Sequence, residues 1–360
     1  MKHHKERVAV AMSGGVDSST VAAWLLEQGY EVIGLNMQLW DHAQTGISGG
    51  RTCCASDDLH DARRVAERLG IPFYVVNLED PFRSAVVDDF IAAYAAGQTP
   101  NPCVRCNQVV KFSHLLAKAK ALDATALATG HYAVLRRTAS GHHELWRGVD
   151  PAKDQSYFLF ATPLEQLPFL RFPLGPLTKE QTRGLAQKFG LHNATKRESQ
   201  DLCFVPDGDY RAFFSRHAPT LVTSGEIVDQ EGRPLGQHHG IGCYTIGQRH
   251  GLGIAAPRPL FVVSIDAARN RIIVGPVESL YKDRLEVIHA NWLARYPWEG
   301  PHPVGARIRY AATPQPVTVE PMDDHHRVKV RFKQPQRAIT PGQACVFYVG
   351  DQVIGGGWIL

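Results

Sequence analysis

No stretch of the 360-residue sequence is apolar over the roughly 20 residues that a membrane-spanning helix needs. Residues 1–6 are polar and basic, and the apolar run behind them, residues 8–12, is too short for the hydrophobic part of a secretory signal. These absences lead us to expect a cytoplasmic protein with no membrane partner.

Cysteine is sparse as well, because the chain has only seven, an odd number. Without a secretory signal we expect no framework of structural disulfides, so burial, metal binding or catalysis must explain these residues. The excess of positive charge is also small, since the net charge is +4 with the 17 histidines counted as neutral. Such a mild excess permits a nucleic-acid partner without requiring one.

The sequence also lacks the GxxxxGK[ST] loop of kinases and GTPases and the GxGxxG turn of dinucleotide-binding folds. It has instead Ser-Gly-Gly-Val-Asp-Ser at residues 13–18, between a buried-strand pattern and an amphipathic-helix pattern. The glycines let backbone N–H groups approach an anion, which the helix start also attracts. We therefore predict a phosphate-binding loop rather than an ordinary glycine turn. Asp17 is unusual beside an anion, and we assign it to Mg²⁺ on the phosphates.

Strand and helix patterns alternate along the first part of the chain. Strands are predicted at 7–12, 31–37, 73–78 and 126–131, helices at 18–28, 57–69, 82–96 and 111–121, and a polar loop at 41–52. Gly29 and Gly70 stand where the first two helices should stop. This order predicts an α/β fold with a doubly wound parallel sheet and ligands at the carboxyl ends of its strands.

Beyond residue 225 the pattern changes to short strands between Gly and Pro turns, which is typical of small barrels and sandwiches. Examples are 261–265, 271–274, 306–310, 328–332 and 344–349. We expect a catalytic ATP-binding domain at 1–210, a small central β-rich module at 211–279 and a β-barrel at 280–360. In the barrel, cations alternate with apolar residues, which puts them on one strand face. These cations are Arg327, Lys329, Arg331 and Lys333. A solvated sheet face is their ordinary explanation.

Two cysteines stand in a CxxC spacing among prolines, Cys103 and Cys106. We expect this turn-rich segment to lie in neither a buried strand nor a helix, which favours a chemical role. Zinc is weakly supported because no second ligand pair follows at finger spacing, and a thioredoxin-like role needs the motif after a strand at a helix start. A sulfur-transferring cysteine and an iron–sulfur site both remain open. We assign no role to the adjacent Cys53 and Cys54 beyond packing or loop structure.

Six strings occur in order along nearly the whole chain. They are SGGVDS at 13–18, TPNPxxxCN at 99–107, ATGHY at 128–132, KDQSY at 153–157, SQDLCF at 199–204 and PGQA at 341–344. In this combination the sequence resembles the tRNA-specific 2-thiouridylases of the PP-loop ATP pyrophosphatase superfamily, whose fold is adenine nucleotide alpha hydrolase-like. Only the first string is shared with other PP-loop enzymes.

The resemblance implies a role for each matched residue. Those implied for ATP are Ala11, Met12, Ser13, Gly14, Gly15, Val16, Asp17, Ser18, Met37 and Gly130. Those implied for the target base are Asn101, Pro102 and Cys103, and those implied for tRNA are His131, Lys153, Asp154, Gln155, Arg309, Tyr310 and Gln343. The implied cofactors are ATP and Mg²⁺, and the implied partners are tRNAs of the Lys, Glu and Gln type and an upstream sulfur-carrier protein. The resemblance also implies that the barrel at 280–360 contacts tRNA, which makes RNA binding the alternative explanation of its four alternating cations.

The resemblance also implies the chemistry. ATP would adenylate the C2 oxygen of the wobble uridine, a persulfide on Cys203 would supply sulfur, and nucleophilic Cys106 would close the cycle in a transient disulfide with Cys203. Many family members carry Asp where this chain has Cys103, so a [4Fe–4S] cluster on Cys103, Cys106 and Cys203 is an alternative. Another PP-loop ligase or amidotransferase, and a non-catalytic RNA-binding protein, are the competing functions.

Overall fold

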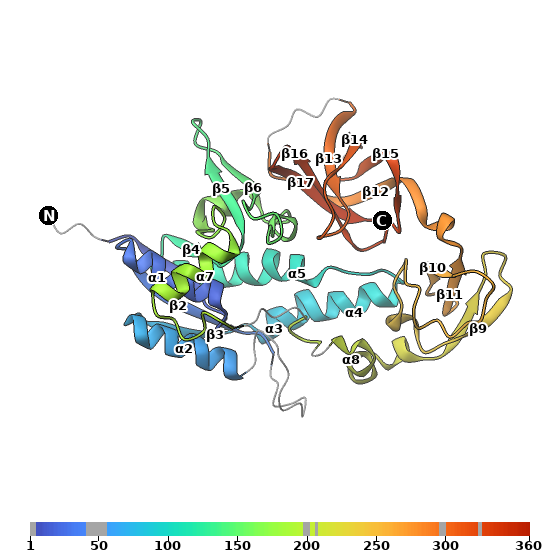
Figure 1. The fold of residues 1–360 in the computed structure, drawn as a ribbon, viewed down its shortest axis with the longest axis horizontal. Helices are drawn as coiled ribbons and strands as arrows, with labels where there is room; N and C mark the ends of the chain where they lie inside the picture. The colour runs from blue at the N-terminus through green and yellow to red at the C-terminus, as the bar shows by residue number, and fades with distance from the viewer. Residues whose placement is uncertain (1–4, 41–55, 197–201, 206–207, 295–299, 323–325) are drawn as a thin grey trace. The chain divides into compact units, whose positions relative to one another are not determined.

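The computed structural model describes residues 5–40, 56–196, 202–205, 208–294, 300–322 and 326–360. The predicted loop at 41–52 and Cys53 and Cys54 lie outside the described residues, as do Ser199, Gln200 and Asp201. No helix in the described part of the chain is long and apolar enough to cross a membrane. The chain forms two compact units, which are described separately (Figure 1).

The first unit consists of Met1–Val86, Cys103–Asp207 and Asp351–Ile354. Its sheet is wholly parallel in the order β3-β2-β1-β4-β7. The strands are β1 (Arg7–Ala11), β2 (Glu31–Gln38), β3 (Phe73–Asn77), β4 (Ala126–Ala128) and β7 (Leu170–Arg171). The doubly wound parallel sheet predicted from the sequence is confirmed, although β4 ends at Ala128 rather than at His131.

Three helices share one apolar core with the sheet. They are α1 (Val16–Glu27), α2 (Ser56–Leu69) and α7 (Lys179–Lys188). Val8 and Val10 of β1 point into this core, while Ala9 between them is buried from the other side, so the strand is apolar throughout. Gly29 and Gly70 follow α1 and α2 with φ of 92° and 65°, the left-handed conformation that ends a helix.

Two helical runs differ from their predicted limits. The first runs through α3 (Glu79–Phe82), a π-helical stretch (Arg83–Val87) and α4 (Asp88–Ala95), close to the predicted 82–96. The second runs through α5 (Pro102–Arg105), a π-helical stretch (Cys106–Leu115) and α6 (Leu116–Ala121), and so begins nine residues before the predicted start. Asn followed by Pro suits a helix start, because Asn caps well and Pro occupies the first turn without loss.

A hairpin that the sequence analysis missed, β5 (Ala133–Arg137) and β6 (His143–Arg147), belongs to the first unit. Its β6 pairs with Gln352 and Val353 near the end of the chain.

The second unit consists of Val87–Pro102, Gly208–Gly350 and Gly355–Leu360. It contains α8 (Tyr210–His217) and a four-stranded sheet ordered β10-β11-β8-β9. The strands are β8 (Gly225–Val228), β9 (Pro234–His238), β10 (Phe261–Asp266) and β11 (Arg271–Gly275). The aromatic rings of α4 and α8 pack together, and Phe90 stacks on Phe214 at 5.8 Å between ring centroids.

The remaining strands form the C-terminal barrel. They are β12 (Tyr281–Trp292), β13 (His302–Arg307), β14 (Gln315–Pro321), β15 (Val328–Arg337), β16 (Ala344–Val349) and β17 (Gln352–Ile359). The antiparallel barrel closes because β12 pairs with both β15 and β17. The predicted alternation on β15 is confirmed, since Val328, Val330 and Phe332 are buried and the cations between them are exposed.

Candidate active site

The order of the parallel strands reverses between β1 and β4, because β2 and β3 lie on one side of β1 and β4 lies on the other. Ligands of open α/β sheets bind at such a switch point, beyond the carboxyl ends of the strands. The loop 13–18 follows β1, and the ATGHY string begins at the last residue of β4. Two strings far apart in sequence therefore meet at the expected site.

The loop is held in shape by its own groups. Gly14 has φ of 78°, and a Cβ there would stand 2.0 Å from the carbonyl oxygen of Asp58, so only glycine fits. The Ser13 N–H donates to Ser18 Oγ at 3.2 Å, and Ser18 Oγ donates to the Gly15 carbonyl at 3.3 Å. The result is a preformed turn that leads into the N-terminus of α1, as anion binding requires.

Asp17 is joined to two residues from other parts of the chain. Lys179 Nζ donates to both of its carboxylate oxygens at 2.8 Å, and the Tyr132 hydroxyl donates to Oδ1 at 2.9 Å. Lys179 is only 9% exposed, although it is a lysine at a helix start. A buried ammonium group thus neutralises the Asp17 carboxylate within the expected anion site.

Sequence reasoning missed Lys179 and a second supporting residue, Asn193. The Asn193 amide donates to the Gly14 carbonyl at 3.0 Å and to Ser19 Oγ at 2.9 Å. These bonds hold the loop through a residue that is distant from it in sequence. Thr178-Lys179-Glu180-Gln181 is a capping-box string and could have located the start of α7. No local pattern could have shown that these side chains reach the loop.

The other residues implied for ATP surround the same turn. Met12 is buried, and its carbonyl accepts from Asn36 Nδ2 at 2.7 Å. Gly130 packs closely against the loop, and a side chain there would crowd it. A Cβ on Gly130 would be 3.0 Å from both Asp17 Cβ and the Ser18 nitrogen. Met37 lies half-buried near the carboxyl end of β2. The structure therefore places the implied ATP residues at the carboxyl ends of β1, β2 and β4.

His131 lies just past β4, with Nδ1 2.7 Å from Thr129 Oγ1 and between the rings of Phe112 and Phe172. Burial, and secondarily the positive charge of Lys111, hold the pKa of His131 well below the ordinary histidine value. The imidazole is therefore neutral near pH 7, so it can form hydrogen bonds but carries no positive charge.

Asp154 and Gln155 of the KDQSY string bind other residues of the first unit. The Asp154 side chain is wholly buried and accepts from Arg147 Nε at 3.1 Å and from the Gly148 N–H at 3.0 Å. Its position does not support the direct tRNA contact that the resemblance implied. Gln155 binds Tyr132 through its side chain at 3.0 Å and its backbone at 2.8 Å, and Tyr132 in turn holds Asp17.

The CxxC motif opens a helix, which corrects the expectation that it lies outside one. Cys103 is exposed in α5, and Cys106 is 9% exposed at the start of the π-helical stretch. A thioredoxin-like motif also lies at a helix start, but it follows a strand, and no strand directly precedes α5. Asn107 anchors the stretch by donating to the Phe158 carbonyl at 3.2 Å.

Cys203 lies half-buried in a turn of the first unit, and the described Cys103, Cys106 and Cys203 are all thiols rather than disulfides. Among the described residues, no group of three His, Cys, Asp or Glu side chains is placed to hold a metal ion.

Two of the barrel residues implied for tRNA, Arg309 and Gln343, bind backbone carbonyls of the protein. Gln343 Nε2 donates to the Thr99 carbonyl at 2.8 Å and to the Pro100 carbonyl at 3.1 Å, so it binds the segment that contains buried Asn101. The predicted strand 306–310 is wrong at its end, because β13 stops at Arg307. Arg309 follows it and donates to the Arg337 and Ala338 carbonyls, and Tyr310 is 38% exposed.

The fold and the glycine loop at its switch point define a PP-loop enzyme, a class that uses ATP. Family models match in series along the chain: a tRNA methyl transferase HUP domain at residues 6–207, a tRNA methyl transferase PRC-barrel domain at 211–276 and an aminomethyltransferase β-barrel domain at 282–359. The chain belongs to the tRNA-specific 2-thiouridylase family, because a relative with that name is 64% identical to it over 99% of both chains.

Three relatives carry the name "tRNA-specific 2-thiouridylase MnmA". The protein of Magnetococcus marinus is 64% identical over 99% of both chains. That of Geobacter metallireducens is 53% identical over 99% of this chain and 97% of its own, and that of Geotalea uraniireducens is 52% identical over 99% and 95%.

Proposed function

We propose that this chain is an ATP-dependent tRNA-uridine 2-sulfurtransferase that converts the wobble uridine of Lys, Glu and Gln type tRNAs to 2-thiouridine. The observation that carries the proposal is the preformed loop 13–18 with Gly130 against it, in a chain 64% identical along its length to a named 2-thiouridylase. The domain limits 1–210, 211–279 and 280–360, and a cytoplasmic location, belong to the same proposal.

Residues 11–18, Met37 and Gly130 bind ATP. The loop N–H groups and the start of α1 hold the phosphates, and Lys179 neutralises the Asp17 carboxylate beside them. Asp17 does not fit a Mg²⁺ ligand in this conformation, because both of its oxygens accept from Lys179 Nζ and Oδ1 also accepts from the Tyr132 hydroxyl. We therefore propose that Mg²⁺ enters on the phosphates of ATP. The ion would add charge neutralisation on the phosphates.

Sulfur transfer begins with adenylation of the uridine and ends with a disulfide between Cys106 and Cys203. The uridine C2 oxygen attacks the α-phosphorus of ATP, and pyrophosphate leaves. The terminal sulfur of the Cys203 persulfide adds to C2, and AMP leaves with the oxygen. The Cys106 thiolate attacks the inner sulfur of Cys203, the sulfur on C2 takes the electron pair, and a Cys106–Cys203 disulfide forms. A cellular thiol reduces this disulfide, and an upstream sulfur-carrier protein reloads Cys203.

The target base, turned out of the anticodon loop, contacts Asn101, Pro102 and Cys103 in this proposal. His131, Lys153, Gln155, Arg309 and Tyr310 are proposed to contact the surrounding tRNA. Because Asp154 is buried and Gln343 binds the backbone of 99–100, we propose that these two position other groups.

The test uses purified protein, ATP, unmodified tRNA, a sulfur donor that carries a persulfide and a thiol reductant, with 2-thiouridine measured by nucleoside mass spectrometry. Cys106→Ser and Cys203→Ser should each lower thiolation at least 1000-fold, because each removes a sulfur nucleophile. Cys243→Ser, half-buried in the second unit, is the matched control and should keep wild-type activity. Normal 2-thiouridine from either of the first two variants would refute the assignment.

Cys103→Asp separates the persulfide route from the iron–sulfur alternative. The persulfide route needs no thiol at this position, so the variant should thiolate tRNA within a few-fold of the wild type. A cluster that uses Cys103 as a ligand would be lost. An anaerobically purified enzyme that contains iron and sulfide, and loses both with its activity in Cys103→Asp, would overturn the persulfide route.

A further inference from the structure

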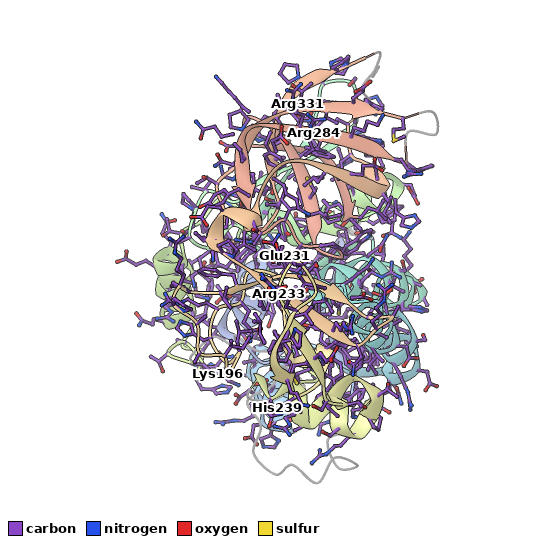
Figure 2. All side chains as sticks on the ribbon, turned by 90° about the vertical axis from the view of Figure 1, so that its right-hand side faces the viewer. Lys196, Glu231, Arg233, His239, Arg284 and Arg331 are labelled. Atoms are coloured by element: carbon purple, nitrogen blue, oxygen red, sulfur yellow. The ribbon has the colours of Figure 1, made fainter. Side chains whose placement is uncertain are left out.

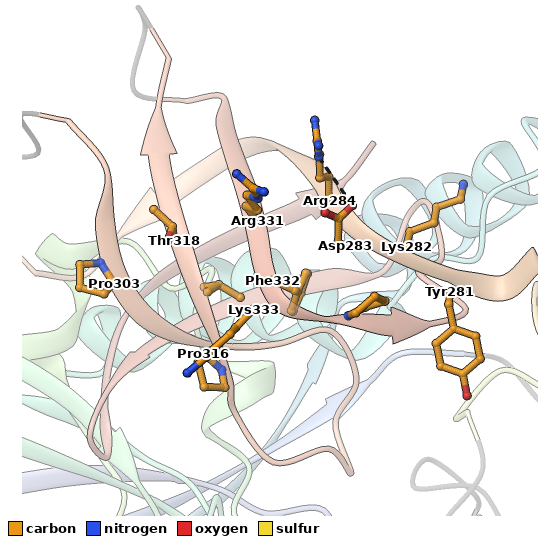
Figure 3. Close-up of a pocket in the computed structure, with 12 residues that line it drawn as sticks. Tyr281, Lys282, Asp283, Arg284, Pro303, Pro316, Thr318, Arg331, Phe332 and Lys333 are labelled. Atoms are coloured by element: carbon orange, nitrogen blue, oxygen red, sulfur yellow. Dashed lines mark ion pairs between the residues drawn. The ribbon is translucent and has the colours of Figure 1, made fainter. Parts of the chain in front are cut away.

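A groove of about 860 Å³ runs across the barrel strands β12 to β15, all within the second unit (Figure 3). Its lining contains four cations, Lys282, Arg284, Arg331 and Lys333. The one acid in the lining is Asp283, whose Oδ1 lies 3.6 Å from Arg284 Nε. The groove therefore has a surplus of positive charge on a protein whose net charge is only +4.

The surplus is built into the strand register. Arg284 of β12 stands directly opposite Arg331 of β15, and Thr318 of β14 flanks Arg331 on its other side. Figures 2 and 3 show the two arginines side by side on the barrel. Like charges directly opposite each other in an antiparallel pair destabilise it, and an anion bound between them reverses that effect.

Two residues before Arg331, the positive charge on the same face of β15 is balanced by acidic residues. Lys329 stands opposite Glu286 on β12 and Glu320 on β14, and Arg327 Nη2 binds Glu286 Oε2 at 2.9 Å. The cation stripe of β15 thus divides into Arg327 and Lys329, which face glutamates, and Arg331 and Lys333, which line the groove and form no ion pair within the described part of the chain. A merely solvated face does not explain this difference.

We propose that the groove binds the sugar–phosphate backbone of the tRNA substrate, a contact that rests on the proposed function. Cations spread over two neighbouring strands suit successive phosphates, which position an RNA without specifying its sequence. Tyr281 at the groove edge is 50% exposed and offers a ring on which a base or ribose can stack. An open groove with so many cations exceeds what a single small anion needs.

The test compares Arg284→Ala/Arg331→Ala with the matched control Lys329→Ala, which removes an exposed cation from the same face. Affinity for unmodified tRNA is measured over a range of salt concentrations. The double variant should weaken tRNA binding roughly tenfold and lower the slope of log affinity against log salt by about 2. Lys329→Ala should change both little, and ATP affinity should stay at the wild-type value in all variants.

Arg331→Glu separates RNA binding from folding. Its carboxylate would stand opposite Arg284, so the unfolding temperature should stay the same or rise while tRNA affinity falls. Equal tRNA affinities for the double variant and Lys329→Ala would overturn the proposal. So would unchanged tRNA affinity with a loss confined to sulfur delivery, which would indicate an acidic protein partner. A wild type that binds tRNA without thiolating it would refute the proposed function instead and leave the groove intact.

Discussion

At the scale of single residues, the charge balance of the loop depends on Lys179. Asp17 lies where a pyrophosphate is expected, and without the lysine its carboxylate would repel that anion. The pair is mostly shielded, with side chains 11% and 27% exposed for Lys179 and Asp17. Partly buried charges of this kind are costly to leave unpaired.

Lys179→Met should therefore weaken ATP binding by about 2 kcal/mol, or roughly 30-fold, and slow tRNA-dependent pyrophosphate release. Titration calorimetry with ATP and a pyrophosphate assay measure the two effects. The control is Lys188→Met on the same helix, which breaks an exposed 2.8 Å ion pair with Glu27 and should cost little. Equal ATP affinities for the two variants would contradict the role of Lys179.

At the scale of elements, the turn at 341–343 after β15 is hydrogen-bonded to the segment 99–100 that leads into α5. The Thr99 N–H donates to the Pro341 carbonyl at 2.9 Å, and Gln343 binds the carbonyls of Thr99 and Pro100. Gly342 has φ of 85°, and a Cβ there would lie 3.1 Å from the Thr99 carbonyl oxygen. The PGQ turn therefore packs directly on the TPNP segment.

Gln343→Ala should loosen this segment in the free enzyme. We expect faster amide hydrogen exchange at residues 98–101 without tRNA, together with lower thiolation, because two hydrogen bonds are lost. Gln336→Ala is the control, since its side chain donates to the nearby Gln334 carbonyl, two residues away on the same strand. If Gln343 acted only by touching tRNA, exchange in the free enzyme would match the wild type.

The sequence predicted the elements whose pattern is local. Buried strands such as β1, β2 and β16 and the glycine-stopped helices α1 and α2 lie close to their expected limits. Asn101-Pro102 misled the prediction, because a turn and a helix start use the same residues. The loop at 13–18 was recognisable for the same local reason, whereas Lys179 and Asn193 reach it from residues more than 160 positions away. Spacing along the chain carries no record of such contacts.

At the scale of the whole molecule, compact units do not follow sequence order. The second unit takes in Val87–Pro102 from the middle of the first part of the chain. Contiguous patterns divide a chain only into contiguous pieces, which is why the sequence suggested three successive domains. The aromatic core explains the difference, because Phe90 and Tyr94 of α4 pack on Phe213, Phe214 and Tyr210.

Phe90→Ala should therefore destabilise the second unit, by about 3–5 kcal/mol, since the ring is 2% exposed and its removal leaves a cavity. Hydrogen exchange should accelerate at 210–222, more than 100 residues away in sequence. Phe82→Ala is the matched contrast: Phe82 is fully buried on the same helical run but contacts Phe204 in the first unit, so the faster exchange should fall at 202–205. A fragment of residues 208–360 that unfolds with wild-type cooperativity and stability would show that α4 is dispensable to this unit, against the expectation.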